Sequence, residues 1–297
     1  MSHARETAAP AVSKWWSYVV LTKPDVTFLV VITTVAGFYL ASPGRIDWLL
    51  LLNTLCGTML VAGGTAALNQ YAERDMDAVM RRTAARPLPT GHLQPLEVLT
   101  FGVGTIFIGS VWLALDVNGL AAAIALATSL LYLGTYTPLK KKTPLATAVG
   151  AFPGALPPLI GWAAAAGSIS TGGWILFGIL FFWQFPHFMA IAWMYRQDYA
   201  RAGIKMLPVV DPQGDATFRQ VIWTSIVLIP VSLLPSLLGL TGMSYFFGAL
   251  ALGMMMAQVG LWANRTRTNL RAKWLMHATV AYIPLLLGWM IFDKLGH

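Results

Sequence analysis

The sequence of 297 residues has little charge and almost no cysteine. Only 11% of its residues are charged, whereas soluble domains have about 25%. The single cysteine, Cys56, excludes an intramolecular disulfide, a CxxC redox pair and a cysteine zinc site. No Walker loop, GxGxxG, HExxH or GxSxG motif is present, so the common nucleotide, zinc-protease and serine-hydrolase signatures are missing. The low charge and the 57% hydrophobic content indicate a polytopic membrane protein.

Nine apolar segments of about 18–24 residues are long enough to cross a bilayer. We expect them near 25–41, 48–71, 96–115, 119–136, 144–166, 173–195, 220–240, 245–263 and 274–292. The predicted fold is an all-α bundle of nine transmembrane helices around a central cavity open to the cytoplasmic side. Gly and Pro residues in the fifth segment predict a kink or a close helix approach. Residues 1–14 are polar, and we expect a disordered tail before a single membrane domain at 15–297.

Basic residues gather on one side of the predicted bundle. If alternate loops share a side, all of the 20 Lys and Arg except Arg45 and Lys294 lie with the N-terminus. Cytoplasmic loops of membrane proteins collect Lys and Arg, so we place the N-terminus in the cytoplasm and the C-terminus outside. The same asymmetry explains the net charge of +8, and nucleic acid is not an expected partner.

Asn69, Glu73 and Asp77 recur every four residues at the end of the second segment. On a helix this spacing places them on one face, about 6 Å apart along the axis. Asp75 falls on another face. Carboxylate and amide oxygens are suitable ligands for a Mg²⁺ ion that also binds phosphate. The alternative is a solvated cap at the end of a membrane helix.

Three arginines follow this carboxylate face: Arg81, Arg82 and Arg86. Guanidinium groups bind phosphate bidentately, so acids followed by a basic loop predict a site for a metal–diphosphate complex. The arginines alone are also explained as the charge signal of a cytoplasmic loop. Asp198 after the sixth segment is a weak signal by itself, but opposite the first acids it would complete a second metal site.

Two further polar pairs lie at the ends of apolar segments. Gln184 and His187 are three residues apart on an aromatic helix, where His187 is either a hydrogen-bonded core residue or a ligand to a metal or haem iron. Tyr136 and Lys140 follow the fourth segment, and alone they are typical of an interfacial aromatic anchor with a basic flank.

From about Lys23 onward, these motifs resemble the UbiA-type superfamily of intramembrane prenyltransferases. The superfamily pattern N-x-x-x-D-x-x-x-D, then R-T-x-x-R-P, is similar to the run of Asn69, Glu73, Asp77, Arg82 and Arg86, with Glu at the middle acid. The Y-x-x-x-K element matches Tyr136 and Lys140. The segment W-Q-x-P-H-F from Trp183, followed by D-Y-x-x-A-G-x-x-M-L-P from Asp198, resembles the haem branch of the superfamily.

The resemblance implies an enzyme of a bacterial inner membrane that transfers a farnesyl group from farnesyl diphosphate to a vinyl group of haem B, its second substrate. It implies Mg²⁺ as cofactor and catalysis by Asn69, Glu73, Asp77, Asp198 and Tyr136, all but the tyrosine as metal ligands. It further implies diphosphate binding by Arg82, Arg86, Lys140 and Lys205, and haem placement by His187 and Gln184. Implied partners are the lipid bilayer and the next haem-modifying enzyme or a terminal oxidase assembly. Quinone-type members carry several acids in the second motif, whereas this sequence has only Asp198 there.

Three other functions stay open. An aromatic prenyltransferase of quinone synthesis would act without haem. A carrier of anionic lipids or metabolites would suit helices broken by Gly and Pro, but a carrier needs access from both faces and nearly all polar groups lie on one. A haem-delivery subunit would bind haem and ignore Mg²⁺ and prenyl diphosphate.

Overall fold

The computed structural model describes residues 13–295, and almost all of its regular structure is helical. Within this part of the chain nine helical segments are long and apolar enough to cross a membrane, as predicted. They are α2 (Pro24–Ala41), α3 (Trp48–Val79), α4 (Pro95–Asp116), Gly119–Leu139, Ala146–Ala166, α9 (Thr171–Met194), α12 (Asp215–Leu237), α13 (Met243–Thr266) and α14 (Asn269–Phe292).

The fourth and fifth spans are each built from shorter pieces. The fourth consists of α5 (Gly119–Leu131), the π-helical turn η1 (Tyr132–Tyr136) and α6 (Thr137–Leu139). The fifth consists of α7 (Ala146–Ala155) and α8 (Pro157–Ala166). A proline cannot supply the N–H that would continue a helix, so α7 ends and α8 begins with Pro157 as its first residue. The predicted kink in the fifth span is therefore confirmed.

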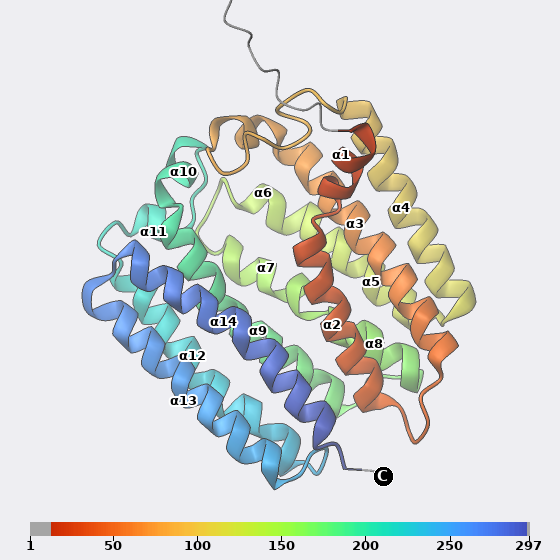
Figure 1. Ribbon diagram of the computed structural model, residues 1–297. Coiled ribbons are helices and arrows are strands. Elements are labelled where there is room, and N and C mark those ends of the chain that lie inside the picture. The colour runs from red at the N-terminus through yellow and green to blue at the C-terminus, as the bar shows by residue number, and fades with distance from the viewer. Residues whose placement is uncertain (1–12, 296–297) are drawn as a thin grey trace, which may run out of the picture.

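Three short helices were not predicted: α1 (Lys14–Leu21), α10 (Arg196–Arg201) and α11 (Leu207–Val210). Helix α1 lies at the upper end of the bundle in Figure 1, with exposed tryptophans on one side and buried Leu21 on the other. That distribution is typical of a helix at a membrane surface. The tail expected at 1–14 lies outside the described residues, except for Ser13, which caps α1, and Lys14, which begins it.

Helix α3 is longer than the predicted span at 48–71. Asp47 caps it by accepting a hydrogen bond from the Leu50 N–H, and the helix then continues for 32 residues to Val79. The polar turns after residue 71 stay helical, so the acid motif lies on one continuous helix.

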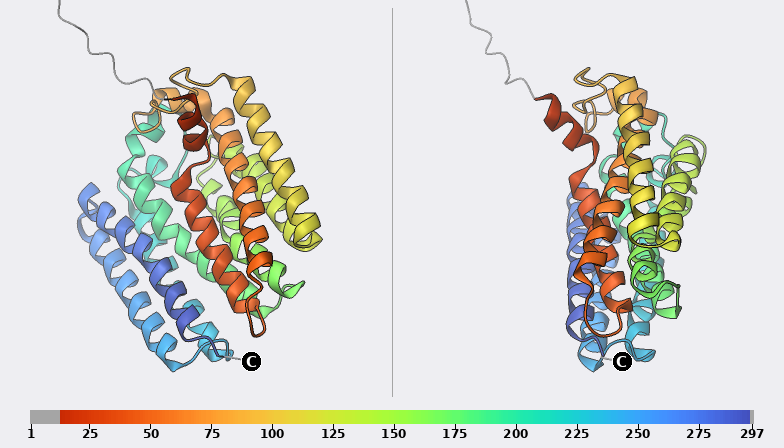
Figure 2. Two further views of the ribbon diagram at one scale, coloured as in Figure 1. Left: turned by 45° about the vertical axis from the view of Figure 1, so that its right-hand side comes forward. Right: turned by 90° about the vertical axis from the view of Figure 1, so that its right-hand side faces the viewer.

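The bundle has two groups of helices, which meet where α2, α7 and α8 pack against α9 and α14 (Figure 1). In the first group α3 packs on α4 and α2 packs on α8; in the second, α9 packs on α12 and α14, with α13 outside. One apolar cluster joins the groups, and it includes Ala36 and Leu40 of α2, Trp183 of α9 and Tyr282 of α14. Seen after a turn of 90° about the vertical axis, the bundle is narrower than in the view of Figure 1 (Figure 2, right).

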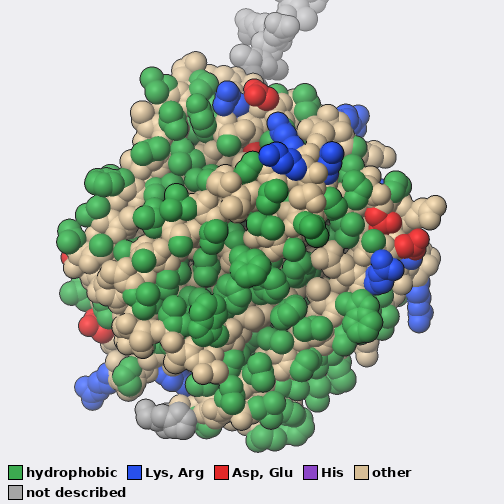
Figure 3. All heavy atoms as spheres, turned by 180° about the vertical axis from the view of Figure 1, so that it is seen from behind, with side chains coloured by type: hydrophobic (Ala, Val, Ile, Leu, Met, Phe, Trp, Pro, Cys, Tyr) green, Lys and Arg blue, Asp and Glu red, His purple; other side chains and the backbone are tan. Residues whose placement is uncertain are grey.

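The outer surface is apolar over the middle of the bundle. Seen from behind, hydrophobic side chains form a broad band and the charged side chains lie towards its margins (Figure 3). Large side chains such as Leu115 and Phe292 are 79% and 85% exposed. Exposed apolar area of this extent needs lipid around it.

The close contact between α2 and α8 gives a first prediction. A Cβ at Gly161 would lie 1.9 Å from the carbonyl oxygen of Thr34, and backbone cannot move aside as a flexible side chain can. We expect Gly161→Ala to lower the free energy of unfolding by about 3 kcal/mol, measured by denaturant titration in detergent. The control is Gly288→Ala on α14, where the added Cβ has no atom within 4 Å among the described residues outside its own stretch of helix. If both variants unfold alike, α2 and α8 do not pack this closely.

Candidate active site

The predicted carboxylate face is buried. Asn69, Glu73 and Asp77 on the last turns of α3 are 1%, 6% and 0% exposed, whereas the side chain of Asp75 is 89% exposed. A solvated helix cap would leave these groups in water. Their burial therefore excludes the cap and calls for partners, because an unpaired buried carboxylate is very costly.

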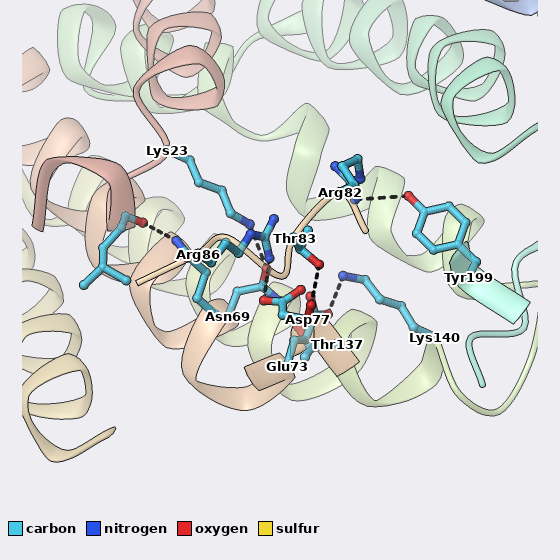
Figure 4. Close-up of polar contacts among 12 residues, drawn as sticks. Lys23, Asn69, Glu73, Asp77, Arg82, Thr83, Arg86, Thr137, Lys140 and Tyr199 are labelled. Carbon is cyan, nitrogen blue, oxygen red and sulfur yellow. Dashed lines mark hydrogen bonds and ion pairs between the residues drawn. The ribbon is translucent and has the colours of Figure 1, made fainter. Parts of the chain in front are cut away.

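Three cations supply those partners, and each comes from a different segment (Figure 4). The contacts are Lys140 Nζ to Glu73 Oε1 at 2.6 Å, Arg86 Nη1 to Asp77 Oδ2 at 2.6 Å and Lys23 Nζ to Asn69 Oδ1 at 3.0 Å. We call these six residues the acid–base cluster. When all three basic side chains are protonated, three cations face two carboxylates, and the cluster has room for further negative charge.

Lys23 is the member of the cluster that we did not predict from the sequence. It precedes Pro24 at the start of α2 and holds a left-handed backbone, φ 48°, which is unusual for a residue other than glycine. Burial lowers the pKa of its ammonium to about 7, and the positive charges of Arg86 and Lys140 act in the same direction. An anion bound beside Lys23 would relieve this repulsion. The available signal was a lysine directly before the first membrane span.

The loop after α3 folds back over the acids. Thr83 is buried and donates a hydrogen bond to the backbone carbonyl of Asp77, and the Arg86 N–H donates to the carbonyl of Thr83. These two bonds turn the chain so that the Arg86 guanidinium reaches Asp77. Arg82 points elsewhere: it lies beside Tyr199 in Figure 4, and its guanidinium donates to the Tyr199 hydroxyl at 3.4 Å.

Tyr136 and Lys140 are brought into the site by the π-helical turn η1. The Lys140 ammonium lies 4.3 Å from the centre of the Tyr136 ring, a cation–π contact. Thr137, which follows the turn, accepts a hydrogen bond from the amide of Asn69 at 3.3 Å. Single π-helical turns inside α-helices are frequent at functional sites, and here the turn joins the fourth span to α3.

Asp198 is near the acid–base cluster but separate from it. It is 8% exposed, pairs with Arg201 and accepts a hydrogen bond from the backbone N–H of Arg82 at 3.3 Å. Lys205 donates its backbone N–H to the carbonyl of Lys140 at 2.7 Å, while its side chain is exposed. Among residues 13–295 no three His, Cys, Asp or Glu side chains are placed to hold one ion.

The donor set nevertheless fits a divalent ion at Glu73 and Asp77. Asp77 Oδ1 is fully buried and has no hydrogen-bond partner. A buried carboxylate oxygen without a partner destabilises the folded protein unless a bound ligand interacts with it. With the Glu73 carboxylate and the Asn69 amide on the same face, it offers hard oxygen ligands of the kind that Mg²⁺ prefers.

His187 and Gln184 lie on α9 in different surroundings. Gln184 is buried, and its amide nitrogen donates to the carbonyls of Ala151 and Leu180, so it ties α9 to α7. His187 is half-buried, its ring is stacked on Trp183, and its Nδ1 is 2.8 Å from the Thr279 hydroxyl. Its Nε2 makes no hydrogen bond with any described residue.

In the described part of the chain, buried acids face cations at one end of a bundle of nine spans, an arrangement that marks functional sites in membrane proteins. The family comparison agrees: the model of the UbiA prenyltransferase family matches residues 30–289, and the chain belongs to this family. The protein is therefore an intramembrane prenyltransferase.

Among its relatives the chain is 49% identical to the protoheme IX farnesyltransferase of Solibacter usitatus, over 94% of this chain and 99% of the relative. It is 44% identical to that of Salinibacter ruber, over 94% and 98%. A solved structure of digeranylgeranylglyceryl phosphate synthase shares the fold, with a TM-score of 0.78, 18% identity and coverage of 95% and 99%. A UbiA homologue from Archaeoglobus fulgidus, solved with DMAPP and Mg²⁺, has a TM-score of 0.66, 14% identity and coverage of 92% and 99%.

The ion pair between Lys140 and Glu73 gives the second prediction. Their side chains are 12% and 8% exposed, so removing one partner leaves the other as a largely buried charge without a counter-ion. We expect Lys140→Met to lower the free energy of unfolding by about 3 kcal/mol. Glu73→Gln combined with Lys140→Met should cost less than the sum of the single changes, measured in a double-mutant cycle. Additive costs would show that the two side chains do not interact.

Proposed function

We propose that the protein transfers the farnesyl group of farnesyl diphosphate to a vinyl group of protohaem IX. The observation that carries the proposal is the acid–base cluster, in which two buried acids, an amide and an excess of cations stand at the end of an apolar bundle. The relatives that are 49% and 44% identical over nearly the whole chain bear the name protoheme IX farnesyltransferase. This supports haem over a quinone precursor as the acceptor.

The diphosphate binds at the acid–base cluster. Lys23, Arg86 and Lys140 turn from their present partners towards the phosphate oxygens, and Arg82 and Lys205 add charge at the rim. Glu73, Asp77 and Asn69 would hold Mg²⁺, with Asp198 nearby, and the ion would supply the positive charge that a diphosphate leaving group requires. The orphaned Asp77 Oδ1 and the surplus cation of the cluster support this arrangement.

The cluster then favours departure of diphosphate. The bond between C1 of the farnesyl group and the diphosphate oxygen breaks, and the electron pair leaves with the oxygen. Once Lys140 and Arg86 have turned onto the phosphate oxygens, they stand where that negative charge grows, and their positive charge lowers the barrier. The apolar helices exclude water from the allylic cation, and the Tyr136 ring offers its face to positive charge.

The acceptor lies along α9. The vinyl π electrons attack C1 and form the new carbon–carbon bond, and water adds to the cation left beside the porphyrin with loss of a proton. The product is a hydroxyethylfarnesyl side chain, which the next haem-modifying enzyme or an oxidase assembly would receive. His187, with its free Nε2, orients the porphyrin, while Gln184 holds α9 in place through its backbone contacts. We further propose that the bundle encloses a central cavity which, like the N-terminus, faces the cytoplasm of a bacterial inner membrane.

The direct test combines purified protein, haem B, farnesyl diphosphate and Mg²⁺, with the product followed by mass spectrometry. We expect a haem that has gained a farnesyl group and a hydroxyl. A prenylated phenolic acid formed without haem would instead support the quinone branch, and haem binding without turnover would support a delivery protein.

Asp77→Asn gives the third prediction. The change removes one carboxylate charge at nearly constant shape, and we expect kcat/KM to fall by about 10³-fold while the variant still inserts and folds. The matched control is Asp75→Asn on the same helix, whose side chain faces solvent and which should keep wild-type turnover. Wild-type turnover in Asp77→Asn would refute the metal assignment.

A further inference from the structure

A hollow with two arginines in its wall lies on the side of Asp198. Its volume is about 370 Å³, and it is lined by Arg81, Arg82, Met194, Tyr195, Gln197 and Asp198. The hollow thus lies between the loop after α3 and the end of α9. The Arg82 backbone N–H donates to Asp198 at 3.3 Å, so the hollow lies next to the loop that folds back over the acids.

The charge of this hollow is positive and partly unpaired. The Arg81 guanidinium makes no hydrogen bond or ion pair with any residue between 13 and 295. The guanidinium of Arg82 makes a cation–π contact with Tyr195, whose ring centre lies 5.2 Å away. This contact orients the guanidinium in the wall of the hollow. Asp198, the acid that lines the hollow, is already paired with Arg201. The hollow can therefore accept an anion with little competition from its own walls.

A partly exposed stripe of α9 leads to this hollow. His187, Ile191 and Met194 are half-buried, whereas the residues between them, such as Met189 and Trp193, are buried. Met194 comes seven residues after His187, on the same face and about 10.5 Å further along the axis. A flat ligand centred near His187 would reach the hollow with its edge.

We propose that the hollow binds the propionate carboxylates of the porphyrin substrate, with Arg81 as the residue that recognises them. This assignment of the propionates rests on the proposed function. Protohaem carries its propionates on the edge opposite its vinyl groups. Carboxylates pair bidentately with guanidinium groups and are costly to bury unpaired. The propionate edge of the porphyrin therefore lies in the hollow, beside Arg81. The vinyl edge then points inward, to where the farnesyl cation forms.

The fourth prediction compares haem B with its dimethyl ester, in which both carboxylates are blocked. In Soret titrations we expect wild-type protein to bind the ester about tenfold more weakly than haem B. Arg81→Gln should weaken haem B binding by about tenfold and leave the ester nearly unchanged, so the two ligands become similar. In steady state, KM for haem should rise and KM for farnesyl diphosphate should stay at the wild-type value. The control, Arg265→Gln, removes an exposed arginine from the same end of the bundle and should change neither.

Two results would overturn this assignment: equal affinity of wild-type protein for haem B and the ester, or an equal loss for both ligands in Arg81→Gln. A rise in KM for farnesyl diphosphate would also overturn the assignment and show that Arg81 belongs to the diphosphate site. Selective haem binding without a farnesylated product would refute the proposed function and leave the hollow as a haem-carboxylate site. Wild-type protein that binds no haem would refute both.

Discussion

The structure depends on the burial of Glu73 and Asp77 at the end of α3. Carboxylates are tolerated inside an apolar bundle only when cations and hydrogen bonds meet them. That requirement draws three distant segments to one point: the start of α2 through Lys23, the loop after α3 through Arg86, and the end of the fourth span through Lys140. The apolar clusters hold the helices together, but these pairs decide how the ends of the helices meet.

The same pairing prepares the cluster for its ligand. Its cations exceed its carboxylates, and Asp77 Oδ1 has no partner. In the proposed function a metal–diphosphate complex would supply both missing elements, because the acid oxygens would hold the metal and the cations would bind the phosphates. The internal ion pairs would then stabilise the free protein and be exchanged for contacts to the proposed substrate. Because this exchange would take place among largely buried groups, each contact would be stronger than on an open surface.

The sequence was most informative where local periodicity determines structure. The nine spans, the break in the fifth, and the shared face of Asn69, Glu73 and Asp77 follow from hydropathy, proline chemistry and helical spacing. Contacts between segments were not predictable in the same way. The reach of Lys23 to Asn69, the contacts of Arg82 with Tyr195 and Tyr199, and the use of Gln184 as a tie between helices arise from tertiary packing. A sequence motif shows which side chains could form a site, but tertiary packing determines which of those side chains come into contact.

The account is tested most directly by an experimental structure of the protein with Mg²⁺ and a non-reactive thio-analogue of farnesyl diphosphate. We expect the ion within about 2.1 Å of Asp77 Oδ1, bridging to the diphosphate, with Arg86 and Lys140 moved onto phosphate oxygens. A diphosphate bound elsewhere, with the ion pairs of Glu73 and Asp77 intact and no ion between them, would contradict the central claim.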